Sequence, residues 1–292
     1  MQRRTFLTSA AAASATLLAT RATGASGNAP TASGLIDTNV YLSDWVIRHS
    51  WADTPAKLVA KLRRHGVTSA WVGSFEGVLH TDIAGVNARL AGACLRDSGG
   101  ILRPFGTINP ALPDWEDDVR RCHEVHRMPG VRLFPNYHGY TLDDPRFARL
   151  LELCGRRKLL VQIALSIEDE RSQNPALAAA PVNAAPLADI LPKFPRARVM
   201  LLNASSRILG TNTALLRRLT PAGVLFEIAI LEMVAGIEML LKSVPEARIA
   251  FGSHVPYFYF EAALLKLQES ALTPAQMDAV RSRHAQAAIT FT

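Results

Sequence analysis

The sequence predicts an α/β protein with the (β/α)8 fold of a TIM-type barrel. Eight short apolar segments that suit buried parallel strands recur along residues 34–292, and each is followed by a helical segment. The last of these strands is apolar, as a strand that closes a barrel should be. A doubly wound open sheet is the alternative, but the turn after Leu42 lacks the Gly-x-Gly pattern that such a sheet would carry there.

The first 33 residues are predicted to be a leader and a linker. Arg3 and Arg4 precede a run of small and apolar residues at 8–20, and small residues at 23–25 suit cleavage. We therefore expect residues 1–25 to be a twin-arginine-type signal peptide and residues 26–33 to be a flexible linker. The apolar run is too short and too rich in alanine to span a membrane. The expected location is outside the cytoplasm, in the periplasm or the extracellular space.

Charge and cysteine content exclude several kinds of protein. The formal net charge is +7, and the predicted leader contains three arginines and no acid, so that its removal leaves +4. The sequence has no basic stripe with interleaved aromatic residues, which argues against nucleic acid as a partner. The widely spaced Cys94, Cys122 and Cys154 are expected to be buried thiols. The expected partner is a small-molecule substrate, with no membrane contact after signal removal, and homo-oligomers are left open.

The first strand of the barrel is expected at residues 34–42. Its polar residues Asp37, Asn39 and Tyr41 alternate with apolar ones, which places the three on one face of a strand. A helix should follow, because Thr54 suits an N-cap and Pro55 suits the first helical turn. Gly66 then ends this helix, which completes the first strand-helix unit.

The other elements follow from the same signals, with Gly, Pro and Ser clusters marking the turns between apolar runs. The further strands are expected at residues 69–75, 101–109, 131–136, 159–165, 198–203, 224–230 and 248–254. The further helices are expected at residues 81–97, 114–127, 145–157, just before 194, 213–219, up to 243, 258–270 and 274–288. A long loop at residues 166–185 separates the fifth strand from its helix.

Polar residues occur near the carboxyl end of almost every predicted strand, which is where barrel enzymes carry their chemistry. The residues are Asp37, Asn39, Tyr41, Glu76, Asn109, Asn136, Tyr137, His138, Gln162, Ser166, Asn203, Glu227 and His254. Each buried polar group destabilises the fold unless it is hydrogen-bonded, so a purely structural barrel needs few of them. The set therefore favours a ligand pocket at the mouth of the barrel.

Four segments, residues 36–42, 130–135, 159–165 and 251–256, together resemble the amidohydrolase-related family in their order and spacing. The resemblance covers residues 34–292. It implies a barrel enzyme that hydrolyses or decarboxylates a small carboxylate-bearing substrate, usually with one zinc or a similar divalent ion.

Carried over position by position, the resemblance implies that the metal ligands of the family are replaced. The two histidines of the first strand become Asn39 and Tyr41, and the histidines of strands five and six become Ala164 and Asn203. The aspartate of strand eight becomes His254. Because an amide oxygen is a poor ligand for zinc, we expect no bound cofactor. A divalent metal held at a new place by Asp37, His138, Glu227 and His254 is the alternative.

Two further residues stand out in this comparison. Arg132 lies in predicted strand four, where the family usually carries Lys or Arg facing the barrel. It is expected either to clamp a substrate carboxylate or to pair internally with Glu227 or Asp37. His138 lies on a glycine-containing loop beside two tyrosines, at the expected mouth.

The function expected from these residues is hydrolysis of a small carboxylate-bearing ester, lactone or amide without a tightly bound metal. His254 or His138 would activate water and Asp37 would orient the base. Asn39, Tyr41, Arg132, Asn136, Asn203 and Glu227 would bind the substrate. Two alternatives are left open: a hydrolase or decarboxylase with a relocated divalent metal, and a non-catalytic barrel that binds a small molecule or a partner protein.

Overall fold

The structure is a computed structural model of the chain. It describes residues 34–52, 54–169, 171, 173–205 and 213–290. The predicted leader and linker lie outside these residues, so export stays a prediction. In the part that is described, no helix has both the length and the apolar character needed to cross a membrane.

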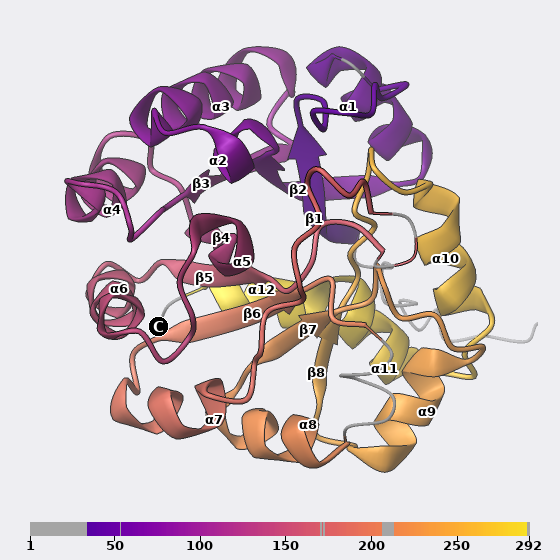
Figure 1. Cartoon of the computed structure of the whole chain (residues 1–292). Helices are drawn as coiled ribbons and strands as arrows, with labels where there is room; N and C mark the ends of the chain where they lie inside the picture. Colours follow the sequence, from indigo (N-terminus) through magenta and orange to yellow (C-terminus); the bar gives the residue numbers. More distant parts are fainter. Residues whose placement is uncertain (1–33, 53, 170, 172, 206–212, 291–292) are drawn as a thin grey trace, which may run out of the picture. The chain divides into compact units, whose positions relative to one another are not determined.

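Eight parallel strands form one sheet in the order of the chain, which confirms the predicted barrel (Figure 1). The strands are β1 (Leu35–Leu42), β2 (Val67–Ser74), β3 (Leu102–Thr107), β4 (Gly130–Leu133), β5 (Leu160–Ala164), β6 (Arg198–Leu202), β7 (Leu225–Glu227) and β8 (Arg248–Ala250). Backbone hydrogen bonds from Thr38 to Phe251 and from His254 to Asn39 bring the end of the chain back to β1. The sheet therefore has its first and last strands side by side.

Most of the helices lie around the outside of the strands (Figure 1). They are α1 (Pro55–Arg64), α2 (Glu76–Leu79), α3 (Ile83–Asp97), α4 (Trp115–Glu124), α5 (Pro135–His138), α6 (Pro145–Arg156), α7 (Leu187–Ile190), α8 (Thr213–Leu219), α9 (Gly236–Ser243), α10 (Phe260–Gln268), α11 (Pro274–Asp278) and α12 (His284–Ile289). Short 3-10 helices η1 (Leu191–Lys193) and η3 (Thr220–Ala222) and the π-helical turn η4 (Ala279–Arg283) complete the elements.

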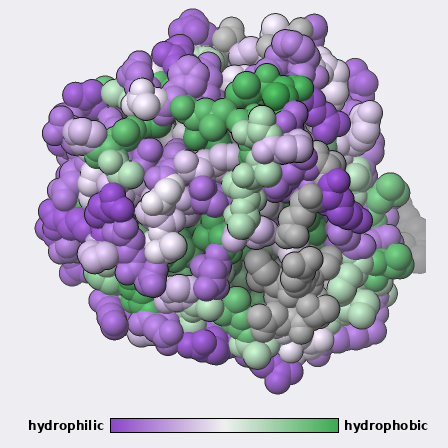
Figure 2. All heavy atoms as spheres, in the orientation of Figure 1, coloured by the Kyte–Doolittle hydropathy of each residue, from purple (hydrophilic) through white to green (hydrophobic). Residues whose placement is uncertain are grey.

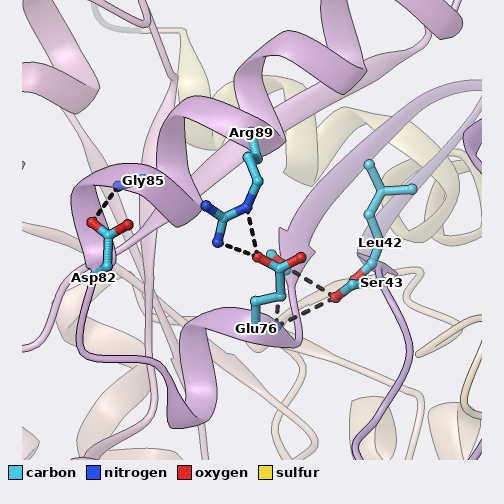
Figure 3. Close-up of polar contacts among 7 residues, drawn as sticks. Leu42, Ser43, Glu76, Asp82, Gly85 and Arg89 are labelled. Atoms are coloured by element: carbon cyan, nitrogen blue, oxygen red, sulfur yellow. Dashed lines mark hydrogen bonds and ion pairs between the residues drawn. The ribbon is translucent and has the colours of Figure 1, made fainter.

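Local sequence explains where several helices begin. The side chain of Thr54 accepts a hydrogen bond from the backbone of Lys57 and caps α1, with Pro55 in the first turn. Asp144 caps α6 in the same way, followed by Pro145. The side chain of Asp82 caps α3 through the backbone N–H of Gly85, as Figure 3 shows. These are the side-chain caps that compensate for the unpaired N–H groups of a first helical turn.

The structure differs from the sequence-based prediction at the ends of the strands. Strand β4 ends at Leu133 and not at residue 136, because Pro135 starts the short helix α5. Strand β7 ends at Glu227, whose own side chain accepts the N–H of Ala229 and turns the chain. Short helix α2 was not predicted either. The strand ends are therefore turns, which bring polar side chains and backbone groups together above the barrel.

Three buried apolar clusters fill the structure. The largest lies between the strands and the surrounding helices, and a second fills the barrel at the amino ends of the strands, where Ala285 and Ala288 of α12 pack beside Ile36 and Leu160. The third closes the opposite end with aromatic rings. The three cysteines are free and buried in the described part, as expected.

Candidate functional site

The interior of β1 and the carboxyl ends of β6, β7 and β8 bring together a set of buried polar side chains, which we call the interior network. Its members are Asp37, Asn39, Asn203, Glu227 and Ser253. The Nδ2 group of Asn39 donates to Oδ1 of Asn203 at 2.7 Å and to Oε1 of Glu227 at 3.3 Å. These contacts link residues of three strands, so the network ties the two sides of the barrel together.

Glu227 is the acceptor at the centre of the interior network. Its Oε1 atom accepts the backbone N–H of Asn203, and Oε2 accepts the N–H of Ala229 at 2.5 Å. Burial raises the pKa of Glu227 above its ordinary value, and these hydrogen bonds and the nearby Lys266 act in the opposite direction. Both oxygens of this carboxylate, which was predicted to bind substrate, are thus engaged by backbone N–H groups that follow β6 and β7.

Asp37 is bound to the residue before His254 and not to the imidazole. Its Oδ2 accepts the hydroxyl of Ser253 at 2.5 Å, and its Oδ1 accepts the backbone N–H groups of Ser253 and Asn39, each at 3.1 Å. Asp37 therefore does not orient the imidazole of His254 by direct contact, contrary to the expectation. Burial raises the pKa of Asp37 to about 7, although the bonds to Ser253 and Asn39 lower it.

His254 is completely buried, and its ring is fixed by the loop after β5. Its Nε2 lies 2.8 Å from the carbonyl oxygen of Ile167, so Nε2 carries the proton and donates. Its Nδ1 is buried with no hydrogen-bond partner in the described part of the chain. Burial lowers the pKa of His254 to about 3, which keeps the imidazole neutral. The predicted base is therefore present with one free lone pair, but sealed from water.

The backbone is strained at two of these positions. Asn203 has φ 56° and His254 has φ 57°, a left-handed conformation that non-glycine residues rarely adopt. Such strain persists only where the surrounding structure imposes it, and it is concentrated at functional sites. Both residues follow the end of a strand, at the mouth of the barrel.

Arg132 is a structural residue. Its guanidinium donates to Oε1 of Gln162 at 2.9 Å, to the carbonyl of Val40 at 2.8 Å and to the carbonyl of Trp71 at 3.1 Å. It also lies over the ring of Tyr41, with 4.4 Å between the guanidinium carbon and the ring centroid. Among the described residues no carboxylate lies within ion-pair distance of Arg132, so the expected direct pair with Glu227 or Asp37 is not formed. Because its donors are already used, Arg132 is a poor candidate for a substrate clamp. Its donors instead satisfy backbone carbonyls inside the barrel.

Tyr41 is the innermost ring of a group of aromatic side chains that covers the interior network. Its ring stacks on Phe75 with 4.2 Å between centroids and meets the edge of His254 at 5.2 Å. Burial raises the pKa of its hydroxyl. The predicted substrate-binding role would require Tyr41 to be reached from outside, and the structure instead covers it with aromatic rings.

His138 and Asn136, the remaining predicted site residues, lie apart from the interior network on α5. His138 is buried, and its Nε2 donates to the carbonyl of Gly77 at 3.0 Å, while burial lowers its pKa to about 4. Asn136 donates to the carbonyl of Ala180 in the loop after β5 at 3.1 Å. Both side chains therefore hold the loops of the mouth in place.

Glu76, another polar residue at a strand end, is likewise engaged with its neighbours. Its Oε2 accepts from Nε and Nη2 of Arg89 at 3.0 and 2.6 Å, and its backbone N–H donates to Oγ of Ser43 and of Ser74 (Figure 3). This contact joins α2 to α3 beside the ends of β1 and β2. It stabilises the outer side of the barrel mouth and is not part of the interior network.

A small open pocket lies directly above His254. It has a volume of about 240 Å³ and is lined by Trp45, Arg48, His49, Ser50, Trp51, Phe75, Pro256, Tyr257, Phe258 and Tyr259. Three of these side chains, Phe75, Tyr257 and Phe258, also pack on the His254 ring, with centroids 6.2, 5.4 and 5.1 Å away. One layer of aromatic rings thus separates this mouth pocket from the candidate base.

Sequence reasoning missed the residues that form this mouth pocket. The hydroxyl of Tyr257 donates to Oε1 of Glu168 at 2.7 Å, and Arg48 lies over the Tyr257 ring at 4.7 Å. The aromatic run at residues 257–259 and the tryptophans at 45 and 51 were the available signal. They lie in loops, however, and give no strand or helix periodicity.

Asp37→Asn should remove a pH dependence of stability. With its pKa raised in the folded state, Asp37 keeps its proton between about pH 4 and 7 while the unfolded chain loses it, so stability falls as pH rises through that window. Relative to wild type, the variant should therefore gain on the order of 2 kcal/mol of unfolding free energy between pH 5 and 7.5. Urea unfolding at the two pH values measures this.

The same substitution at the exposed Asp143 controls for the change in net charge. An effect of Asp37→Asn that is equal at both pH values would show that Asp37 is already ionised in the folded protein at pH 5.

The amidohydrolase family model matches residues 52–283. No curated protein matches the sequence.

Solved structures of three decarboxylases share the fold. The 5-carboxyvanillate decarboxylase of Sphingomonas paucimobilis is 14% identical, with a TM-score of 0.71 over 89% of this chain and 99% of that one. The 2,6-dihydroxybenzoate decarboxylase of Rhizobium is 12% identical, with a TM-score of 0.66 over 88% and 98%. The dihydroxybenzoic acid decarboxylase of Polaromonas sp. JS666, with bound manganese and the inhibitor 2-nitroresorcinol, is 12% identical, with a TM-score of 0.68 over 88% and 96%.

The expectation of no cofactor is corrected, because the Polaromonas structure and two similar structures of a 5-carboxyvanillate decarboxylase from Novosphingobium aromaticivorans contain manganese, which points to a divalent metal. In the part described, no three His, Cys, Asp or Glu side chains are grouped as ligands, so the relocated set is not assembled. The carboxylates of Asp37 and Glu227 are occupied by hydrogen bonds, and Asn39 Oδ1 is one buried oxygen without a partner. This arrangement does not fit a divalent metal, and no chemical step is derived through one.

Proposed function

The chain belongs to the amidohydrolase family, and from this premise we propose that it takes up a small aromatic carboxylic acid in the mouth pocket. The observation that carries the proposal is the composition of that pocket: aromatic walls on several sides and one arginine at its edge. Aromatic side chains stack on a planar ring, and a guanidinium binds a carboxylate. The two features together suit an aromatic acid.

The size of the mouth pocket supports a ligand with one ring. Its volume of about 240 Å³ is below the roughly 300–1,000 Å³ of pockets that hold drug-sized molecules. The similar structures include decarboxylases of 5-carboxyvanillate and 2,6-dihydroxybenzoate, which are one-ring aromatic acids. This substrate class agrees with what the pocket of the present chain can hold.

Arg48 is the residue assigned to the carboxylate. It is exposed, and its guanidinium rests on the ring of Tyr257, which holds it at the edge of the mouth pocket. A guanidinium has five N–H groups, so its contact with one tyrosine leaves donors for a carboxylate. Arg132, which sequence analysis assigned to this task, is buried below.

Arg48→Ala should weaken binding of 2,6-dihydroxybenzoate about 10-fold or more, because a charge-assisted hydrogen bond is removed. Fluorescence titration can follow binding, since Trp45 and Trp51 line the mouth pocket. Resorcinol, which lacks the carboxylate, should bind wild type and variant equally. Arg64→Ala, an exposed arginine in α1, is the matched control. Equal affinities of wild type and Arg48→Ala for the acid would refute the assignment.

A second candidate function is catalysis: His254 would act as a general base in a reaction of the bound acid. It is favoured by the free Nδ1 lone pair of a ring whose Nε2 is fixed, together with the strained backbone at this residue. A neutral imidazole can accept a proton from water or from a substrate group. The aromatic layer would have to move for the substrate to reach it.

A further inference from the structure

The mouth face of the barrel carries a concentration of exposed apolar side chains. Among the described residues, ten large hydrophobic side chains are exposed. Five of them belong to segments around the mouth pocket, and we call these five the apolar rim: Val46, Ile47, Trp51, Leu79 and Tyr259. Figure 2 shows hydrophobic surface gathered over the region that follows β1 and over α2. Contiguous exposed apolar surface of this kind marks a binding face.

Val46 and Ile47 form the tip of a tight turn. The backbone N–H of Arg48 donates to the carbonyl of Trp45 at 2.8 Å, which closes the turn. Trp45 is buried beneath it, whereas Val46 is 66% exposed and Ile47 is 47% exposed. Turn tips ordinarily carry Gly, Asn, Asp, Ser or Pro, because these residues suit the backbone and the solvent. Two β-branched aliphatic residues at this tip instead leave much of their apolar surface exposed.

Several basic residues lie near the apolar rim, together with Asp44 and Glu76, which contact His49 and Arg89. Arg48 follows the turn, and α1 carries Lys57, Lys61, Arg63 and Arg64 with no acidic residue. Lys61 pairs with Glu261 and lies over the ring of Trp51 at 5.4 Å. Trp and Tyr beside Lys and Arg are the residues that stabilise proteins at a membrane interface, where aromatic rings enter the headgroup layer and cations meet anionic lipids.

We propose that the apolar rim docks the mouth of the barrel on an anionic membrane surface, with Val46 and Ile47 inserted among the lipids. This departs from the expectation of no membrane contact. A second copy of the chain is a poorer occupant, because a symmetric contact would set Arg48 and α1 against the same cations. Trp51 and Tyr259 belong to both the rim and the mouth pocket, so the pocket would open towards the lipid headgroups. The docking itself does not depend on what the pocket binds.

The test is sedimentation of the full chain with vesicles. The Val46→Ser, Ile47→Ser double variant should bind vesicles of phosphatidylcholine and phosphatidylglycerol about 10-fold or more weakly than wild type, because two inserted aliphatic side chains are lost. Binding of wild type should also fall with added salt and be weak on pure phosphatidylcholine. Residues 1–33 are common to all variants, so the difference between variants isolates the turn.

A matched control removes apolar surface elsewhere. Leu95 is 86% exposed and Val125 is 60% exposed, and both lie at the C-terminal ends of their helices beside a different groove. The Leu95→Ser, Val125→Ser double variant should bind vesicles like wild type. Equal binding by the two double variants, or no binding of wild type to anionic vesicles, would overturn the proposal. A wild-type dimer in light scattering that the Val46→Ser, Ile47→Ser variant lacks would assign the rim to a second copy instead.

Discussion

Arg132→Met should lower the free energy of unfolding by about 4 kcal/mol, the scale on which a buried charged partner is lost. The guanidinium is completely buried and donates to Gln162 and to the carbonyls of Val40 and Trp71. Methionine fills part of the volume but donates nothing, so these acceptors stay unpaired inside the barrel. Denaturant unfolding followed by circular dichroism measures the loss.

Two further variants define the cause of that loss. Arg132→Lys keeps the charge but cannot reach all three acceptors, so we expect an intermediate loss of stability. Arg64→Met, at an exposed position in α1, should leave the unfolding free energy within about 0.5 kcal/mol of wild type. If Arg132→Met instead kept its stability and lost affinity for 2,6-dihydroxybenzoate, the side chain would be a substrate clamp after all.

The location of Arg132 explains why its replacement should lower the free energy of unfolding. Its side chain crosses the barrel so closely to Gly73 that a Cβ there would lie 2.8 Å from Nη1. A glycine is therefore needed opposite the guanidinium. The arginine connects β4 and β5 with β1 and β2, and it occupies the space below Tyr41 that an open active site would leave free.

His254→Asn should reduce conversion of a bound aromatic acid by about 100-fold, the usual scale for losing a general base, while binding in the mouth pocket remains. Asparagine tolerates the positive φ of this position better than most other non-glycine residues, so the backbone should be kept. It cannot act as a base near neutral pH. Loss of 2,6-dihydroxybenzoate by liquid chromatography measures conversion, and melting temperature is recorded on the same samples.

His254→Asp provides a second comparison at this position. It restores the aspartate that the resemblance places here, without restoring histidines at Asn39 and Asn203, so it should not recover conversion. If both variants only lower the melting temperature and conversion per folded molecule is unchanged, His254 is a packing residue that holds Ile167. If wild type converts none of the aromatic acids, the catalytic candidate fails and the binding function stands alone.

The two histidine environments also show why the reaction could not be read from strand-end residues. The imidazole of His254 is neutral because it is desolvated, and His138 is lowered in pKa for the same reason. A histidine near its ordinary pKa, which sequence analysis assumed, would have to be in contact with water. Burial depends on which loop covers the side chain, and that loop comes from β5.

Much of the fold could be predicted because it depends on local signals. The apolar run at β1, the Thr54 and Pro55 signal at the start of α1 and the identical bounds of α8 at 213–219 depend only on neighbours in sequence. Alternation in β1 also placed Asp37, Asn39 and Tyr41 on a common face. The strand-helix repeat then fixed a barrel, because parallel strands need helical crossovers.

The partners of the strand-end residues were decided only by the tertiary structure. Asn39 meets Glu227 across 188 positions of sequence, and His254 is covered by Ile167 from 87 positions away. Arg132 donates to backbone carbonyls and not to carboxylates, because the strands hold those carbonyls within reach of its side chain. Hydrogen bonding and desolvation act over a few ångströms in space, whereas sequence patterns report on neighbours along the chain. The sequence by itself therefore determined the barrel and the candidates, and the packing of loops over the strand ends determined which of them can meet a ligand.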